Sequence, residues 1–296
     1  MTDKTVVAAV VGRPNVGKST LVNALVGEKI AIVSPKPQTT RNRIFGIFEK
    51  DGTQVVLLDT PGFHRARTRL GDFMVKTVND SVADVDAAVL VVEPVDNVGV
   101  QESQLIERIR ASGAPAILVI NKTDTVKKED LLPIIARYGQ AYAFDAVVPL
   151  SARTGDGVSE LADELLRFRQ EGEPLFPDDM ITDQPERQMC AELVREKLLM
   201  TLQREVPHGT AVEVTRFHER DDGITDIDVT IYCEKAGHKG IIIGKNGAAL
   251  KKVGELARRD IEKLLDGRVC LKTWVKVKEN WRDSDVMIKN FGYTDE

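Results

Sequence analysis

Eight consecutive residues near the amino terminus have the types and spacing of a phosphate-binding loop, G-x-x-x-x-G-K-[ST]. They follow an apolar run, Val6–Val11, and precede a helical pattern that extends from Thr20 to Val26. The two glycines let the backbone curl so that its N–H groups face an anion, and the dipole of the following helix adds attraction. We therefore predict a nucleoside triphosphate site. Its predicted residues are Gly12, Arg13, Pro14, Asn15, Val16, Gly17, Lys18, Ser19 and Thr20.

Side chains of the loop and of two later segments are suited to bind a magnesium ion and the γ-phosphate. Lys18 would reach the β- and γ-phosphates, and the Ser19 hydroxyl would ligate Mg²⁺. Asp59 follows an apolar strand and would hold a water of the metal. Thr40 is our choice for the hydroxyl that closes over the metal, with Thr39 as the alternative. Asp59 is the first residue of the segment Asp59, Thr60, Pro61 and Gly62, which we predict to be part of the nucleotide site. The backbone N–H of Gly62 would donate a hydrogen bond to the γ-phosphate.

A second motif predicts which base is bound. Asn121, Lys122, Thr123 and Asp124 follow the apolar strand Ala116–Ile120, at the strand end where α/β proteins bind ligands. The Asp124 carboxylate can accept hydrogen bonds from the N1–H and the exocyclic amine of guanine, and adenine has no such donor pair. The base is therefore predicted to be guanine. Backbone N–H groups of Ser151, Ala152 and Arg153 would complete the pocket.

The position after Asp-x-x-Gly departs from a common pattern. Many such enzymes have a Gln there that orients the attacking water, whereas this chain has Phe63, which cannot hydrogen-bond through its side chain. His64 is next in line, and we interpret it as a solvated residue rather than a base. Asn15 has two interpretations that stay open. Its side-chain oxygen would ligate K⁺, or it only stabilises the loop turn.

The fold class follows from alternating strand and helix patterns. We predict an α/β domain with a doubly wound, mainly parallel six-stranded sheet and helices on both faces. Its strands are predicted at Val6–Val11, Ile44–Phe48, Val55–Leu58, Ala87–Val92, Ala116–Ile120 and Val147–Leu150. Three cysteines without a CxxC pair indicate neither a zinc site nor a disulfide. No apolar run approaches the ~18 residues that a membrane helix needs, and the first residues leave no room for a signal peptide.

The carboxyl-terminal part differs in charge. The first 187 residues have 22 basic and 27 acidic residues, but 235–282 have 13 basic and 5 acidic ones. Within this basic stretch lies a G-x-x-G sequence, which in KH domains clamps about four nucleotides of single-stranded nucleic acid. We predict helix 189–202, strands 211–217 and 224–232, helices 241–253 and 255–265, and strand 269–277. The predicted RNA-binding residues are Gly244, Lys245, Asn246, Gly247, Lys251 and Lys252.

Together the motifs resemble the Era family of bacterial GTPases over nearly the whole chain. The resemblance rests on GRPNVGKST, KPQTTRNRI, DTPGFH, NKTD, SAR, ITDQPER and GIIIGKNGAALKKVG, in family order. It implies GTP hydrolysis with Mg²⁺, a type 2 KH domain that recognises the 3′ end of 16S ribosomal RNA, and assistance to assembly of the 30S subunit. It also implies a hydrophobic residue in place of the Gln, as at Phe63. Some family members associate with the inner face of the cell membrane. We predict catalytic roles for Lys18, Thr40 and Gly62.

The predicted organisation is a G domain at 1–170, a linker at 171–187, a KH domain at 188–284 and a tail at 285–296. We expect a monomer in the cytoplasm that binds GTP or GDP. Two other functions are compatible with parts of the sequence. One is an RNA-binding module whose nucleotide only supports the fold, which the retained Lys18, Ser19 and Asp59 argue against. The other is a tRNA-modification GTPase, which the KH order and the lack of a catalytic Cys motif argue against.

Overall fold

The computed structural model describes residues 3–63, 66, 68–203 and 206–293. Backbone contacts divide the chain into two compact units, and each is described by itself. The first unit comprises residues 1–33, 40–67 and 71–183, and the second comprises 34–39, 68–70 and 184–296. Among the described residues, every helix is too short or too polar to cross a lipid bilayer.

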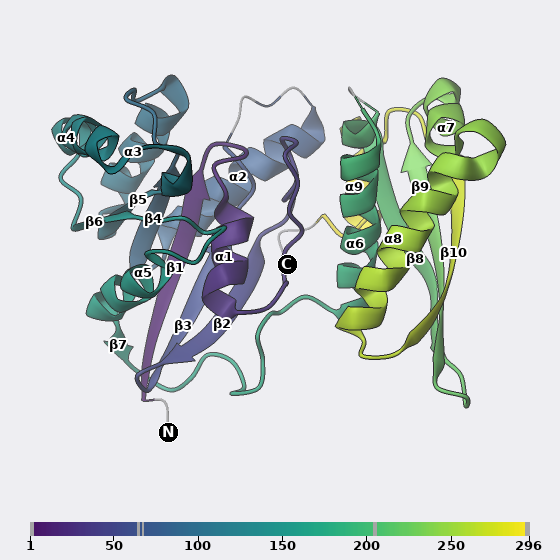
Figure 1. Cartoon of the computed structure of the whole chain (residues 1–296), viewed down its shortest axis with the longest axis horizontal. Coiled ribbons are helices and arrows are strands. Elements are labelled where there is room, and N and C mark those ends of the chain that lie inside the picture. Colours follow the sequence, from purple (N-terminus) through teal and green to yellow (C-terminus); the bar gives the residue numbers. More distant parts are fainter. Residues whose placement is uncertain (1–2, 64–65, 67, 204–205, 294–296) are drawn as a thin grey trace. The chain divides into compact units, whose positions relative to one another are not determined.

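The first unit contains the predicted sheet (Figure 1). Its strands lie in the order β2-β3-β1-β4-β5-β6, with β2 antiparallel to β3 and the others parallel. A two-residue strand, β7, adds an antiparallel partner to β1, which the sequence did not predict. The strands are β1 (Lys4–Gly12), β2 (Ile44–Lys50), β3 (Thr53–Asp59), β4 (Ala87–Val92), β5 (Ala116–Ile120), β6 (Ala146–Pro149) and β7 (Gln170–Glu171).

Helices cover both faces of this sheet, which confirms the predicted doubly wound α/β class. One apolar core contains residues of α1 and α5 together with one face of the central strands. The other core contains residues of α2, α3 and α4 with the opposite face. The central strands are buried along their whole length, as expected for a parallel sheet covered on both sides. The helices are α1 (Lys18–Val26), α2 (Arg69–Ala83), α3 (Val100–Ser112), α4 (Leu131–Ala141) and α5 (Val158–Leu165).

The segment that the sequence predicts as a linker is ordered in its first part. The Gln54 side chain on β3 accepts hydrogen bonds from the backbone N–H groups of Leu175 and Phe176. Residue Thr182 forms an isolated antiparallel bridge with Gly46 of β2. The chain therefore runs along the first unit until Asp183, where the second unit begins. Whether the predicted domain boundaries delimit independently folding pieces stays a prediction.

The second unit has the predicted α-β-β-α-α-β order. Three strands in the order β10-β9-β8 carry helices α6, α7 and α8 on one face (Figure 1). β8 is antiparallel to β9, and β10 is parallel to it. The elements are α6 (Glu186–Thr201), β8 (Thr210–Glu219), β9 (Ile224–Cys233), α7 (Ala236–Ile243), α8 (Ala248–Leu264), β10 (Arg268–Val277) and α9 (Asp285–Asn290).

The predicted helix boundaries around the G-x-x-G sequence are wrong. The sequence placed one helix over 241–253 and another over 255–265, whereas α7 ends at Ile243 and α8 extends unbroken from Ala248 to Leu264. Gly244, Asn246 and Gly247 have φ of 73°, 53° and 79°, so a right-handed helix cannot continue through them. The loop therefore separates the two helices. Gly254, which falls between the two predicted helices, lies inside α8.

Candidate functional site: a nucleotide pocket and a G-x-x-G turn

The phosphate loop joins β1 to α1 and presents a buried lysine. The Lys18 side chain is only 6% exposed, and its ammonium donates to the carbonyl oxygens of Gly12 (3.1 Å) and Arg13 (2.9 Å). Burial lowers the pKa of Lys18 to about 8, and the nearby Asp59 carboxylate offsets part of this. The loop thus holds a cation inside its own curve, ready for a polyphosphate.

Two hydroxyls and one carboxylate meet beside this lysine. The Ser19 hydroxyl donates to Oδ2 of Asp59 at 2.6 Å and lies 2.8 Å from the Thr40 hydroxyl. The alternative residue Thr39 instead donates to the backbone oxygen of Lys36 at 2.7 Å. The structure therefore brings together three of the predicted metal residues, and it favours Thr40 over Thr39. Their roles at a metal stay predictions.

The donor set of this cluster fits Mg²⁺. Asp59 is fully buried, and its Oδ1 atom has no hydrogen-bond partner among the described residues. Burial raises the pKa of the Asp59 carboxyl to about 6, although hydrogen bonds from Ser19 and Thr40 and the charge of Lys18 oppose the rise. A divalent cation prefers such hard oxygen ligands and would restore the charged form.

Close approaches of neighbouring atoms explain why glycine occupies three positions of the pocket. A Cβ on Gly12 would lie 2.4 Å from the backbone oxygen of Val91. A Cβ on Gly62 would lie 2.7 to 2.9 Å from atoms of Pro14. Gly17 has φ of 99°, and its Cβ would lie 2.3 Å from Nδ2 of Asn121. Any side chain at these positions would push apart the segments that form the predicted phosphate site.

Asn121 ties three loops together. Its Nδ2 donates to the backbone oxygen of Val16 at 2.9 Å, and its Oδ1 accepts from the backbone N–H of Ala152 at 3.0 Å and of Lys122 at 2.8 Å. The Lys122 ammonium donates to the backbone oxygen of Asn15 at 2.7 Å. The phosphate loop, the base motif and the Ser-Ala-Arg segment therefore form one connected frame.

The Asp124 carboxylate already has two partners. The Ser151 hydroxyl donates to it at 2.6 Å, and the Arg153 guanidinium forms an ion pair with its other oxygen. The Ser151 hydrogen bond, helped by the charge of Arg153, lowers the pKa of Asp124 below its ordinary value. The sequence predicted only backbone contacts from Arg153. The Arg153 side chain is 77% exposed and occupies one oxygen of the Asp124 carboxylate. Guanine would have to displace the guanidinium from this oxygen or bind beside it.

Two acidic residues pair with basic residues of the site, and neither of them was predicted from the sequence. Glu93 forms ion pairs with Lys122 and with Arg13, and the buried Glu102 of α3 also pairs with Arg13. These pairs fix the phosphate loop to α3 and to the base motif. Glu93 directly follows β4, and a charged residue at that end of a central strand was the available signal.

Phe63, which takes the place of the Gln, is buried. Its backbone N–H donates to the Gly12 oxygen at 3.0 Å, and the Arg108 guanidinium lies 4.1 Å from the centre of its ring. The ring therefore packs in the apolar core that contains residues of α3. His64 lies outside the described residues. Asn15 is exposed with φ of 67°, which is compatible with both interpretations of this residue.

The remaining predicted residues of the pocket lie where the motifs place them. The Thr60 hydroxyl donates to the Val10 oxygen at 2.7 Å, and the Thr123 N–H donates to the Leu150 oxygen at 3.2 Å. Val16 and Pro61 are buried, and Thr20 is half-buried.

The G-x-x-G turn of the second unit exposes its polar residues. Gly244 cannot carry a side chain, because its Cβ would lie 2.7 Å from the Ala249 Cβ. Lys245 and Asn246 are exposed between the two glycines, at the beginning of α8. Lys251 and Lys252 are exposed in the first turns of the same helix, so the structure leaves these two lysines as well as Lys245 and Asn246 accessible.

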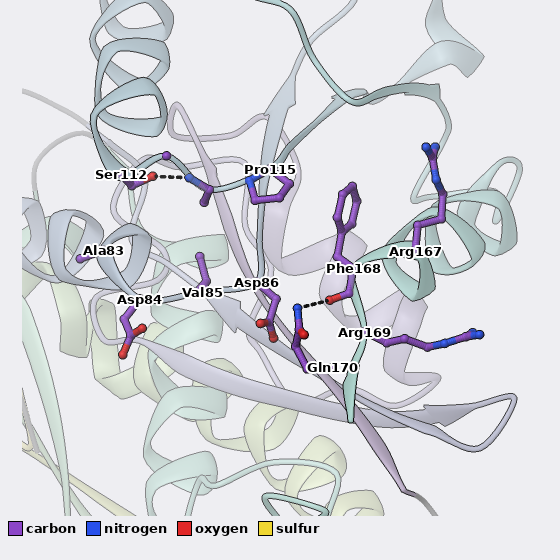
Figure 2. A pocket seen from close by; sticks show the side chains of 12 residues that line it. Ala83, Asp84, Val85, Asp86, Ser112, Pro115, Arg167, Phe168, Arg169 and Gln170 are labelled. Atoms are coloured by element: carbon purple, nitrogen blue, oxygen red, sulfur yellow. Dashed lines mark hydrogen bonds between the residues drawn. The ribbon is translucent and has the colours of Figure 1, made fainter. Parts of the chain in front are cut away.

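A separate hollow of about 440 Å³ lies at the amino ends of β4 and β5, the sheet end opposite the nucleotide motifs (Figure 2). Its polar groups make structural hydrogen bonds. Asp86 accepts from the Val7 N–H at 2.8 Å, and the Ser112 hydroxyl accepts from the Ala114 N–H at 3.3 Å. We assign no ligand to it.

Comparison with known proteins decides the family. A model described as a 50S ribosome-binding GTPase matches residues 7–122, and a KH domain model matches residues 205–282. GTPase Era of Ruminiclostridium cellulolyticum is 48% identical over 99% of this chain and 98% of its own length. The chain belongs to the Era family of GTPases. GTPase Era of Clostridioides difficile is similar too, with 49% identity over 97% of each chain.

Solved Era structures match the whole fold. One is a crystal structure of Era in complex with MgGDPNP and nucleotides 1506–1542 of 16S ribosomal RNA, with a TM-score of 0.95 and 37% identity over 98% of this chain and 99% of that one. Another, with the same values, is an Aquifex aeolicus Era variant bound to GDP·AlF₄⁻. The activity of this Era-family chain is therefore hydrolysis of GTP, and the predicted guanine nucleotide specificity is confirmed.

Proposed function

We propose that this GTPase binds 16S ribosomal RNA near its 3′ end through the second unit. By this binding it would assist maturation of the small ribosomal subunit, and GTP hydrolysis would change its hold on the RNA. The observation that carries the proposal is the match along the whole chain to an Era bound to nucleotides 1506–1542 of 16S ribosomal RNA. The exposed G-x-x-G turn with Lys245 and Asn246 supplies the chemistry, because its glycines admit a sugar–phosphate backbone and its lysine pairs with phosphate.

The residues for hydrolysis are proposed from the first unit. Ser19, Thr40 and Asp59 would hold Mg²⁺ directly or through a water, and the ion would neutralise charge on the transferred phosphoryl group. Lys18 would bind the β- and γ-phosphates. The Gly62 N–H would bond the γ-phosphate and release it after hydrolysis, which makes the residues around it sensitive to the nucleotide state.

The attacking water has to be oriented without a Gln. The Phe63 ring is packed in the core, so the groups available are backbone N–H and C=O groups and a cation held near Asn15. A K⁺ ion at Asn15 would supply positive charge beside the phosphates. Exchanging K⁺ for Na⁺ at constant ionic strength tests this. Slower GTP turnover in Na⁺ would support a K⁺ ion at Asn15. Equal turnover in both salts would mean that Asn15 only stabilises the loop turn.

The RNA assignment is tested by placing negative charge in the turn. The double variant K245D/N246D puts carboxylates against the RNA backbone, and we expect RNA affinity to fall by at least about tenfold. Turnover of GTP should stay normal, because the nucleotide residues lie in the other unit. The matched control K128D reverses an exposed charge in the first unit and should leave RNA affinity unchanged. Undiminished RNA binding by K245D/N246D would reject the assignment.

One measurement separates this function from its two alternatives. Turnover of GTP is followed with and without an RNA that corresponds to the 3′ end of 16S ribosomal RNA. A merely structural nucleotide predicts no turnover in either case. A tRNA-modification GTPase predicts turnover that responds to tRNA rather than to the ribosomal RNA. The proposed function predicts turnover and binding of the ribosomal RNA.

We further propose that the chain acts in the cytoplasm as a monomer that joins the 30S subunit, with peripheral contact to the inner face of the cell membrane. The family resemblance supports the association with the 30S subunit and the membrane contact. Sedimentation tests the oligomeric state, and fractionation of cells into cytosol, ribosomes and membranes tests the location.

A further inference from the structure

One tryptophan of the second unit is unusually accessible. The chain has two tryptophans, and Trp281 is fully buried with its indole N–H donating to the Gly209 oxygen at 3.0 Å. Trp274, in β10, is 45% exposed. Burying an indole is worth more than burying most other side chains, so a solvent-facing one raises the question of what it contacts.

Strand periodicity defines the face on which Trp274 lies. Along β10, Val269 and Val275 are buried under the helices, and their register partners on β9 include Ile231, which is fully buried. Residues of the opposite parity therefore point away from the helices. This opposite side of β10 presents the exposed side chains of Lys272, Trp274 and Lys276, which we name the Trp274 face.

The Trp274 face carries excess positive charge. Residues 268–278, which include both sides of β10, contain four basic residues and no acidic one, and two of the four, Lys272 and Lys276, belong to this face. Lys272 and Lys276 make no ion pair with any residue in the described part of the chain. Asp228 on β9 is in register with Lys272 on one side and with Arg216 on the other, so one carboxylate faces two cations. Asp226, further along β9, already pairs with Arg220 and Arg216.

This combination of groups matches single-stranded RNA. A base can stack on the indole, and phosphates on either side can pair with lysines that lie two residues away, about 7 Å along the strand. A protein partner would favour a contiguous apolar centre with few charges, whereas lysines flank this tryptophan and Thr230 lies opposite it on β9. Both α7 and α8, which hold the G-x-x-G turn, pack against β10.

We propose that the Trp274 face is a second RNA-contacting surface, where RNA that continues beyond the nucleotides clamped at the G-x-x-G turn stacks one base on Trp274 and pairs with Lys272 and Lys276. The inference rests on the proposed RNA-binding function and extends it. The turn would hold about four nucleotides, and the Trp274 face would add affinity for RNA that is longer than these four.

The test compares two RNA lengths on the full chain. The variant W274A should weaken binding of a single-stranded RNA of about 12 nucleotides by roughly tenfold, because stacking of one base is lost. Binding of a tetranucleotide should not change. W274F, which keeps an aromatic ring, should restore most of the affinity. The matched control V286A truncates another exposed hydrophobic side chain, 68% exposed, and should bind both RNAs like the parent.

The lysines are tested by salt dependence. The double variant K272Q/K276Q should make binding of the longer RNA less salt-dependent, with the logarithmic slope smaller by about 1.4. The control K263Q, at an exposed lysine of α8, should leave the slope unchanged. Binding of the longer RNA should also protect the Trp274 fluorescence from quenching by acrylamide. In the control W274A, only Trp281 fluoresces, and its quenching should not change when RNA is added.

Two failures are distinguishable. If the parent chain binds the longer RNA and K245D/N246D abolishes this, but W274A and K272Q/K276Q bind like the parent, the Trp274 face is not an RNA surface and the proposed function stands. If neither RNA binds the parent chain, the proposed function itself fails. Quenching protection by an acidic peptide but not by RNA would assign the face to a protein partner and overturn the inference.

Discussion

The two glycine-containing loops of this chain hold, in opposite ways, the lysine that we predict to bind phosphate. In the first unit Lys18 is 6% exposed and held by two backbone oxygens, whereas in the second unit Lys245 is exposed at a turn. A nucleotide has a fixed shape, so a preorganised, desolvated loop can match it group by group. A long RNA strand offers many similar phosphates, and an exposed turn can contact it without a rigid pocket. Similar sequence elements are therefore suited to recognition of a defined small ligand in one unit and of a polymer in the other.

The largest expected effect is that of K18A, which tests whether the buried lysine of the first unit is needed to bind the nucleotide. K18A removes a buried charge that would contact the phosphates and that also lies near the Asp59 carboxylate. We expect GTP affinity or turnover to fall by about a hundredfold or more. Titration with a fluorescent GTP analogue and phosphate release measure the two quantities.

Its counterpart in the second unit is K245A. Because this lysine is exposed and would contribute one of several phosphate contacts, RNA affinity should fall only a few-fold, and the salt slope by about 0.7. Circular dichroism of both variants controls for folding. Equal losses from K18A and K245A in their respective assays would contradict the contrast between a preorganised and an open site.

The second prediction concerns base selection. D124N should lose GTP affinity by roughly a hundredfold, because the amide presents a donor where guanine also has donors. Affinity for XTP should rise, since the xanthine carbonyl can accept from that amide. Competition binding with GTP, XTP and ATP measures this. The same GTP affinity in D124N and the parent chain would show that Asp124 does not select the base.

The third prediction follows from the raised pKa of Asp59. With a pKa of about 6, this carboxyl is mostly protonated at pH 5 and mostly ionised at pH 7. Mg²⁺ needs the ionised form, so metal affinity should fall by about tenfold between pH 7 and pH 5. For the protein without metal the sign is opposite. The folded state retains its proton up to higher pH than the unfolded chain, so this group lowers stability as pH rises from about 4 to 6.

Titrations of Mg²⁺ against the GDP-bound protein at several pH values measure the metal dependence. The variant D59N removes the titrating group and serves as the control, since its residual metal affinity should not follow the same curve. A parent chain whose metal affinity is constant from pH 5 to 7 would show that Asp59 is ionised throughout.

The smallest expected effect concerns Arg153, whose ion pair with Asp124 is exposed to solvent. Such pairs contribute little to binding or stability, because water and salt screen them. R153A should therefore raise guanine nucleotide affinity by no more than about fivefold, because guanine would no longer compete with the guanidinium. R167A, which removes another exposed pair with Glu164, is the matched control. A large loss of affinity in R153A would mean that the guanidinium contacts the nucleotide.

The sequence by itself determined the phosphate loop, the base motif, the fold class and the order of the second unit. These features depend on short-range physics. Consecutive backbone groups of residues 12–19 make the anion site, apolar strands alternate with helical patterns, and glycine permits turns that other residues do not. The family resemblance then supplied the function, because the motifs occur in one order over the whole chain.

Only the tertiary structure decided which side chains meet. It brought Asn121 to the phosphate loop, placed Glu93 and Glu102 on Arg13, and paired Arg153 with Asp124. These partners are far apart in sequence, and their pairing depends on strand order and helix position rather than on local pattern. The exposure of Trp274 was decided in the same way. Strand alternation says that it lies opposite Val275, but only the packing of the helices on one face shows which of the two is buried.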